Sequence, residues 1–237
     1  MSLQFKRVLL KLSGEAMMGQ QRFGFDPEMF NYVAGEIAQA HQAGLEIGVV
    51  IGGGNIFRGT MAEELKIDRV AADHMGMLAT VINAIALVEA LDRRGSPARL
   101  LTAQEMRAFG EPFIRRRALR HLEKGRVAVF AGGTGNPYFT TDSAAALRAI
   151  EMRAEILLKA TSVDGLYDKD PKKSTDARFI KSITFGEAIA KQLKVMDSTA
   201  FTLCQDNKIP IRIYSLRESG ALLRIANGED VGSLVTG

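Results

Sequence analysis

The sequence of 237 residues predicts an α/β fold in which a mostly parallel central sheet carries helices on both faces. Short apolar runs alternate along the chain with helical patterns, which is typical of βαβ units. Three of these runs end in glycine-rich turns, and parallel sheets bind ligands at the carboxyl ends of their strands. Hydrophobic residues make up 46% of the chain, enough for a large core, and no linker or repeat interrupts it. We therefore expect a single domain over residues 1–237.

The first elements are the clearest. Val8–Leu12 is an apolar strand, and Asp26 followed by Pro27 predicts the N-cap and first residue of a helix that ends before Gly44. Residues 45–51 predict a second strand. A long helix follows, and its spacing predicts an apolar face made of Val70, Met77, Leu78, Val81, Ile82, Ile85 and Val88.

The second half continues the alternation with weaker signals. Residues 104–117 are polar and match no element, so this segment, with its run of three arginines, is either part of an oligomer face or simply solvated. Thr141 or Asp142 predicts the cap of a helix that runs to about residue 153. The remaining elements expected are strands at 98–101, 127–130, 156–158 and 211–213, and helices near 186–194 and 198–207.

Composition excludes several classes of protein. The formal charge of +4 and the pI near 9.2 suit anionic small substrates, and no dense basic tail indicates nucleic-acid binding. Cys204 is the single cysteine, which excludes a disulfide within the chain and a zinc site of paired cysteines. No apolar run reaches the roughly 18 residues typical of a membrane span. We expect a reducing, cytoplasmic compartment.

The glycine turns follow three predicted strands, at Ser13-Gly14, at 52–54 and at 132–135. Glycine lets a backbone approach a phosphate closely and direct several N–H groups at it. The plain alternative for any one of them is a tight turn, but three at equivalent strand ends favour a phosphorylated ligand. The P-loop and dinucleotide signatures are both missing, because no glycine precedes a lysine and position 138 is tyrosine.

Two cations lie beside these turns. Lys11 interrupts an apolar strand two residues before Ser13, and Arg58 follows the triple glycine. Each is either a solvated side chain or a phosphate contact, and the positions favour the contact. Of the three histidines only His74 borders a helix start, where packing or capping is the simpler explanation, and no Ser-His-Asp arrangement emerges.

These segments resemble the amino acid kinase superfamily. The residues that carry the resemblance are Lys11-Leu12-Ser13-Gly14-Glu15, Gly52-Gly53-Gly54-Asn55, Phe57-Arg58-Gly59 and Asp164-Gly165-Leu166-Tyr167 with Asp170-Pro171. Three further blocks narrow the resemblance to the bacterial uridylate (UMP) kinases: residues 73–80, residues 133–142 and Lys194-Val195-Met196-Asp197. The resemblance spans essentially the whole chain in order.

The resemblance implies a three-layer fold and the transfer of the γ-phosphoryl group of ATP to UMP, in pyrimidine nucleotide biosynthesis. Donor and acceptor are anions, and two doubly charged groups ~5 Å apart repel by roughly 13 kcal/mol at an effective dielectric of ~20. Cations, backbone N–H groups and a Mg²⁺ carried on the phosphates must therefore converge, without metal ligands from the protein. A family member that phosphorylates a small carboxylate is the alternative.

The resemblance also implies roles for particular residues. Lys11, Arg58, Asp142 and Asp197 would be catalytic, with Asp197 positioning the lysine, and Asp142 is also compatible with a plain helix cap. Asp73 would recognise the UMP sugar, since a carboxylate pairs well with vicinal hydroxyls. The implied ATP contacts, mainly C-terminal, are Lys11, Leu12, Ser13, Gly14, Gly54, Arg58, Thr161, Tyr167 and Asp170, and the implied UMP contacts, mainly N-terminal, are Gly53, Asp73, Thr134, Gly135, Asn136, Pro137, Tyr138, Phe139, Thr140 and Thr141.

Regulation follows only from the resemblance. The family is usually hexameric, activated by GTP and inhibited by UTP, with no membrane or nucleic-acid partner. The residues that this implies as effector contacts are Gly19, Gln20, Gln21, Arg22, Phe23 and Gly24, with Arg99 and Arg126.

Overall fold

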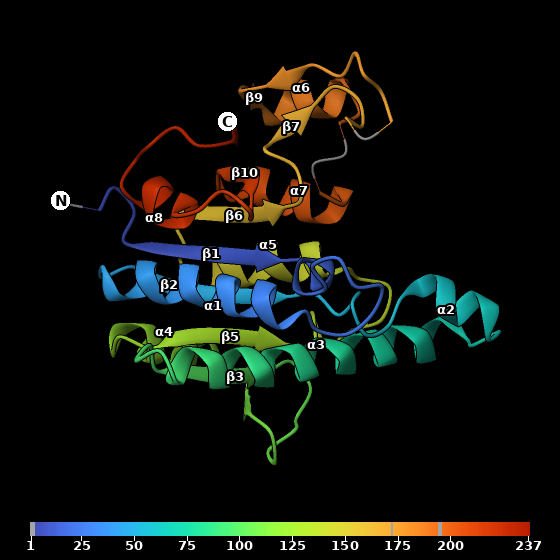
Figure 1. Cartoon of the computed structure of the whole chain (residues 1–237), viewed down its shortest axis with the longest axis vertical. Helices are drawn as coiled ribbons and strands as arrows, with labels where there is room; N and C mark the ends of the chain where they lie inside the picture. The colour runs from blue at the N-terminus through green and yellow to red at the C-terminus, as the bar shows by residue number, and fades with distance from the viewer. Residues whose placement is uncertain (1–2, 172, 194–195) are drawn as a thin grey trace.

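The computed structural model describes residues 3–171, 173–193 and 196–237 (Figure 1). Among these residues the main sheet has nine strands in the order β4-β3-β5-β2-β1-β6-β10-β11-β9. Its strands are β1 (Arg7–Leu12), β2 (Glu46–Ile51), β3 (Ala98–Thr102), β4 (Glu111–Pro112), β5 (Val127–Ala131), β6 (Ile156–Thr161), β9 (Ser182–Thr184), β10 (Ile211–Ser215) and β11 (Ser233–Thr236). A separate antiparallel pair joins β7 (Leu166–Tyr167) to β8 (Phe179–Ile180).

Helices cover both faces of the main sheet, as the sequence predicts. One core cluster packs α1 (Pro27–Gln42), α3 (Arg69–Asp92) and α8 (Ala221–Ala226) on one face. The second cluster packs α4 (Arg115–Glu123), α5 (Thr141–Glu151), α6 (Phe185–Ala190) and α7 (Ser198–Asp206) on the other. The 3₁₀ helix η1 (Gly14–Met17) follows β1, and α2 (Gly59–Glu64) projects beyond the carboxyl ends of the strands (Figure 1).

The strand order reverses beside β1. After β1 the chain forms β2 on one side, and it returns only after β5 to place β6 on the other side. Both neighbours run parallel to β1. Strand β5 also runs parallel to β2, and β10 runs parallel to β6 but antiparallel to β11. Since open parallel sheets bind ligands where the strand order reverses, the carboxyl ends of β1 and β6 are the expected place for a site.

Strand parity explains why a lysine stands in an apolar strand. In β1, Val8, Leu10 and Leu12 join the core under α1 and α3, while Leu9 joins the core under α5 and α7. Successive side chains point to opposite faces, so Lys11 lies on the α5 face. The register pairs Lys11 with Lys159 of β6, which places two lysines side by side on that face.

Several sequence predictions are confirmed and others are wrong. Asp26 caps α1 by accepting from the Met29 N–H at 3.0 Å, and Gly44 follows the helix in the left-handed region at φ +99°. The cap of α5 is Thr140, not Thr141 or Asp142. The segment 104–117 is not featureless, because it forms β4 and begins α4.

The apolar face of α3 also differs from the prediction. The residues turned into the fold are mostly small or polar, namely Ala72, Ala79, Thr80, Val81, Asn83, Ala84, Leu87, Ala90 and Leu91. Of the residues expected there, Leu78, Ile82 and Ile85 are exposed. Contrary to expectation, α3 is long and apolar enough for a membrane span, but half of its most apolar window is buried inside the fold. We interpret it as a core helix whose outer side is apolar.

Candidate active site at the carboxyl edge of the sheet

The centre of the site is one carboxylate between two ammonium groups. Asp142, in the first turn of α5, has its Oδ1 2.8 Å from the Nζ of Lys11 and its Oδ2 2.7 Å from the Nζ of Lys159. All three side chains are at least four-fifths buried. The carboxylate therefore holds both ammonium groups at the point where the strand order reverses.

Burial and charge act against each other in this cluster. Burial on its own raises the pKa of Asp142, but the charges of Lys11 and Lys159 outweigh it and hold the pKa below its usual range. Burial also lowers the pKa of Lys159, and the charge of Lys11 lowers it further, while Asp142 and Asp197 oppose that shift. The cluster holds two largely buried ammonium groups in positions from which they can bind an anionic ligand.

Asp142 therefore contacts both lysines directly, while Asp197, to which the resemblance assigns the positioning of the lysine, acts on Lys159 through its charge. The carboxylate of Asp197 caps α7 by accepting from the Ala200 N–H at 2.8 Å, and it accepts from the hydroxyls of Thr140 and Ser143. It thus joins the start of α7 to the start of α5. The alternative that Asp142 is only a helix cap is wrong, because Thr140 caps the helix and the Asp142 carboxylate faces the lysines.

The first two glycine turns touch each other. A Cβ on Gly14 would lie 2.5 Å from the Gly54 nitrogen, so only glycine permits this approach between the loops. A Cβ on Gly53 would lie 2.7 Å from the Cβ of Ala79 and 2.8 Å from the carbonyl oxygen of Gly76, both on α3. The close approach that Gly53 permits is therefore to α3. At Gly54 the nearest atom is the Cγ of Glu15 at 3.7 Å, which leaves that side open.

Two polar residues of α3 hold the loops in place. The Asn83 amide donates to the Gly52 carbonyl at 2.6 Å and is also bonded to the Asn55 amide. One turn earlier, the Thr80 hydroxyl accepts from the Gly132 N–H at 2.8 Å. The side chains of Thr80 and Asn83 are buried and hydrogen-bonded, so they fix the positions of the glycine turns against α3.

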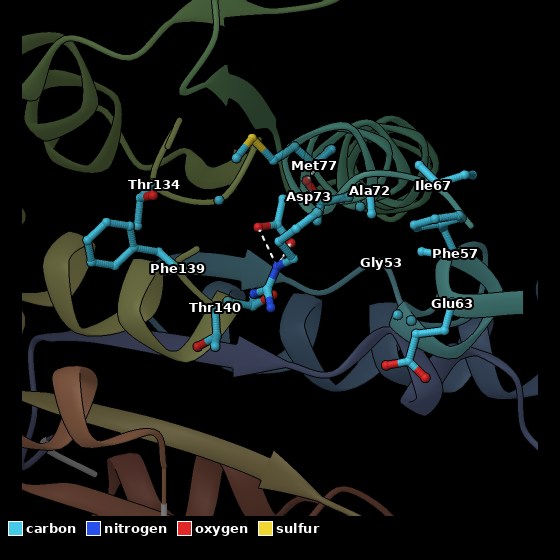
Figure 2. Close-up of a pocket in the computed structure, with 18 residues that line it drawn as sticks. Gly53, Phe57, Glu63, Ile67, Ala72, Asp73, Met77, Thr134, Phe139 and Thr140 are labelled. Atoms are coloured by element: carbon cyan, nitrogen blue, oxygen red, sulfur yellow. Dashed lines mark hydrogen bonds and ion pairs between the residues drawn. The ribbon is translucent and has the colours of Figure 1, made fainter. Parts of the chain in front are cut away.

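A cavity of about 650 Å³ opens between these loops and α3 (Figure 2). Such a volume suits a small molecule of nucleotide size. Seven of the residues assigned to UMP or ATP line it: Gly53, Gly54, Asp73, Thr134, Phe139, Thr140 and Thr141. Gly135, Asn136, Pro137 and Tyr138 belong to the same loop but do not line the cavity.

Asp73 lies in this cavity with both carboxylate oxygens engaged (Figure 2). Arg69 Nε donates to Oδ1 at 3.0 Å and to Oδ2 at 2.9 Å, and the Tyr138 N–H donates to Oδ2 at 2.7 Å. Burial raises the pKa of Asp73, but these bonds outweigh it and leave the pKa below its usual range. The side chain is thus an ionised hydrogen-bond acceptor at neutral pH.

Five of the nine residues assigned to ATP line two hollows on the C-terminal side. Lys11, Ser13 and Thr161 line one of about 480 Å³ together with Lys159, and Tyr167 and Asp170 line another of about 490 Å³. The Tyr167 ring packs edge-on against Phe179 in the β7–β8 hairpin, which fixes an aromatic face there.

The other four predicted ATP contacts lie outside these hollows. Gly54 lines the cavity around Asp73, and Gly14 packs against Gly54. The Leu12 side chain is fully buried in the core, so the prediction that it contacts ATP is wrong for that side chain. The Arg58 side chain turns back on the loop, donating to the Gly54 carbonyl at 2.8 Å and lying 3.4 Å from Glu15. It lines none of the three hollows described above.

The residues assigned to effectors do not come together within the described chain. Gly24 bonds to Asn55 at the glycine turns, and Gly19 and Gln20 line a hollow beside η1. Arg99 lies instead in β3, and Arg126 directly precedes β5 at the strands' amino ends. Gln21, Arg22 and Phe23 are exposed on the same loop as Gly24.

Sequence reasoning missed Lys159, Arg69, Thr80 and Asn83. Lys159 stands alone between apolar residues of a strand, the signal that drew attention to Lys11. Asn83 likewise interrupts an apolar helix, which is a detectable anomaly. Arg69 carries no such signal, because an arginine at a helix start is ordinary. His74, the histidine singled out, is exposed on α3 outside the cavity lining.

Comparisons with known proteins agree over almost the whole chain. Residues 6–215 match the model of the amino acid kinase family. The chain is 56% identical to a uridylate kinase of Xanthomonas oryzae, covering 99% of this chain and 98% of the relative, and 55% identical to a uridylate kinase of Methylococcus capsulatus, covering 98% of each. A UMP kinase structure from Bacillus anthracis superposes with a TM-score of 0.95 at 39% identity, covering 98% of this chain and 96% of that one.

Proposed function

The chain belongs to the amino acid kinase family, and we propose that it is a nucleoside monophosphate kinase that transfers the γ-phosphoryl group of ATP to UMP. The products are ADP and UDP, in the synthesis of pyrimidine nucleotides. The observation that carries the proposal is the Lys11–Asp142–Lys159 cluster, which lies between the cavity around Asp73 and the hollow around Ser13 and Thr161.

The two sides of the cluster suit the two nucleotides. The cavity around Asp73 receives UMP, mainly from N-terminal elements, and the hollows around Thr161 and Tyr167 receive ATP, mainly from C-terminal elements. Both belong to one sheet, so we assign both to a single domain. Thr141 lines the UMP cavity directly before Asp142, which brings the acceptor phosphate next to the lysines.

The reaction needs positioning and charge rather than a covalent nucleophile. An oxygen of the UMP phosphate, already ionised, forms a bond to the γ-phosphorus while the bond from that phosphorus to the ADP oxygen breaks. Lys11 and Lys159 stabilise the negative charge on the transferring group, and Asp142 keeps both ammonium groups in place. Arg58 contacts the phosphates once its ion pair with Glu15 is broken. Both side chains of that pair are exposed, so breaking it costs little free energy.

Magnesium fits this site as a companion of the phosphates. The described residues contain no group of three or more acidic, histidine or cysteine side chains that could hold a metal ion alone. Mg²⁺ usually keeps water and substrate phosphates as ligands, so we propose that the nucleotide phosphates and water hold the ion, without a ligand from the protein. When bound, the ion supplies neutralisation of phosphate charge.

We propose from the family resemblance that the chain assembles as a homohexamer, and one apolar surface supports contact between copies. Met75, Leu78, Ile82 and Ile85 follow one another at helical spacing on the outer side of α3, and each is exposed. We call these four residues the outer stripe of α3. Exposed apolar patches of this kind are typical of interaction surfaces.

The proposed effectors of the enzyme and its proposed cellular compartment both come from the family resemblance. GTP would activate through the loop 19–24 with Arg99 and Arg126, and UTP would inhibit. The hollow beside Arg99, about 470 Å³, supports a ligand at that end of the sheet. We place the protein in the cytoplasm, without a membrane or nucleic-acid partner.

The direct test measures UDP formed from ATP and UMP with magnesium, using CMP and dUMP as alternative acceptors. UDP formation in the complete mixture, and its loss on chelation of magnesium, is the expected result. Glutamate and acetylglutamate test the carboxylate alternative, for which ADP release with them and none with UMP would be decisive. Absence of UDP with and without GTP would overturn the proposed function.

A further inference from the structure

Arg69 has no part in the reaction as described above, yet its guanidinium engages the residue that meets the acceptor sugar. It is the first residue of α3 and stands one helical turn before Asp73, so the two side chains share a face. Arg69 lines the acceptor cavity, and its Nε donates to both Asp73 oxygens. The Arg69 side chain is 60% exposed, and a pair so open to water adds little to folding stability.

A second contact joins Arg69 to the loop on the far side of the cavity. The Tyr138 N–H donates to Asp73 Oδ2 at 2.7 Å, and the Arg69 Cζ lies 5.5 Å from the centre of the Tyr138 ring. Tyr138 has a φ of +70°, a conformation that costs energy in a residue other than glycine and that its surroundings must hold. One guanidinium thus contacts both partners of the bond that joins α3 to the loop.

The bonds leave the two carboxylate oxygens unequal. A carboxylate offers about four lone-pair positions, two on each oxygen. Oδ2 accepts from both Arg69 and Tyr138, whereas Oδ1 accepts from Arg69 alone. Oδ1 therefore keeps a position for another donor. The χ2 torsion of an aspartate has a broad distribution when nothing restrains it. The hydrogen bonds from Arg69 and Tyr138 therefore determine which carboxylate oxygen can accept from a ligand.

We propose that Arg69 is a positioning residue for acceptor specificity, which fixes the Asp73 carboxylate and the Tyr138 loop so that Oδ1 accepts from a sugar hydroxyl of a ribonucleoside monophosphate. The inference rests on the proposed function, because it takes UMP as the acceptor. It predicts that Arg69 contributes to the discrimination between UMP and an analogue that lacks the hydroxyl.

The experiment compares binding of UMP, 2′-deoxy-UMP and 3′-deoxy-UMP to the full chain by titration calorimetry, beside steady-state kinetics. In Arg69→Gln we expect UMP affinity to fall about tenfold, the usual effect of losing one charge-assisted hydrogen bond, while the weaker-binding deoxy analogue loses much less. The kcat at saturating UMP and the KM for ATP should change less than about threefold. Arg69→Lys should restore part of the discrimination, since it keeps the charge without the planar fork.

Two comparisons separate positioning from general electrostatics. Arg69→Gln introduced into Asp73→Asn should produce little further loss, because the partner that Arg69 positions is already altered. Arg93→Gln removes an exposed arginine at the other end of α3 and should leave all three affinities unchanged.

The overturning results are distinct for the two proposals. An Arg69→Gln variant that keeps full discrimination, or that loses UMP and both analogues by the same factor, would overturn the role of Arg69. Equal losses in the Asp73→Asn background and in the unaltered chain would do the same. An unaltered chain that binds no UMP would overturn the proposed function itself.

Discussion

Asp142 is bonded to two buried lysines, and this shared carboxylate governs the chemistry at the level of single residues. Each lysine approaches one carboxylate oxygen, at 2.8 Å for Lys11 and 2.7 Å for Lys159. Removing either ammonium leaves Asp142 with the other, so the charge of the carboxylate is not left alone in the interior. Either lysine can therefore be replaced without leaving the buried carboxylate unpaired.

Lys11→Met keeps the length of the side chain but removes its charge. We expect kcat to fall about 10²–10³-fold, the loss typical of deleting one group that stabilises transition-state charge. The free energy of unfolding should change little, because Lys159 still pairs with Asp142. Initial rates of UDP formation and urea unfolding measure the two quantities. Lys6→Ala, an exposed lysine just before β1, is the control, and equal kcat values in the two variants would contradict the assignment.

Asp142→Asn tests the balance of charges through pH. Burial lowers the pKa of Lys159 and the charge of Asp142 opposes this, so removing that charge lowers the pKa further. Lys159 then loses its proton at lower pH, and the alkaline fall in kcat should begin at lower pH than in the unaltered chain. Profiles of kcat against pH, with exposed Asp206→Asn as control, measure the shift. A fall at unchanged or higher pH would show that Asp142 does not keep Lys159 charged.

At the scale of elements, α3 explains how the glycine turns are held. The inner face of α3 carries small residues at the place where the second glycine turn packs against it. The same face carries Thr80 and Asn83, which form hydrogen bonds with the backbone of the glycine turns. Large apolar residues would not fit there, and they occupy the outer side. This is why the apolar face predicted from periodicity contains the exposed Leu78, Ile82 and Ile85 beside residues that do pack into the core.

Gly53→Ala and Gly54→Ala separate packing from ligand approach. In Gly53→Ala the new Cβ meets Ala79 and Gly76 of α3, so we expect a loss of about 1–3 kcal/mol in the free energy of unfolding. Gly54→Ala has open space and should be nearly as stable as the unaltered chain, but Gly54 lines the acceptor cavity, so its new Cβ should raise the KM for UMP. Urea unfolding and steady-state kinetics test both. A Gly53→Ala protein of unaltered stability would show that the loop can move away from α3.

On the scale of the whole molecule, we propose that the outer stripe of α3 is a contact between chains. Leu78 is 51%, Ile82 49% and Ile85 38% exposed, on a helix whose inner face is already packed. Burying such a patch against another copy would remove apolar surface from water and stabilise an assembly.

Ile82→Glu places a charge in the middle of the outer stripe. We expect the mass measured by light scattering after size exclusion to fall toward that of a smaller assembly, because the charge would be buried at the contact. Ile189→Glu, which alters an apolar residue of α6 exposed to the same degree, should leave the mass unchanged. Equal masses for the unaltered chain and Ile82→Glu would exclude the stripe as a contact between copies.

The sequence alone determined the class of fold, the caps of the clearest helix and the glycine turns. These depend on local patterns: alternation of strands and helices, Asp26 before Pro27, glycine at the ends of apolar runs. The assignment of residues to ATP and UMP came from the resemblance to a family, and the structure separates most of them into an acceptor cavity and donor hollows.

Only the tertiary structure decided which side chains act together. Lys159 joins Lys11 because β1 and β6 pair in a particular register, and no local pattern carries the register of strands so distant in sequence. Asp142 lies between the lysines because Thr140 takes over the cap of α5 and leaves the Asp142 carboxylate free to turn inward. Arg69 gains its role because a loop from β5 folds over the start of α3. Periodicity fixes what an element is, whereas close packing between elements fixes which of its residues meet.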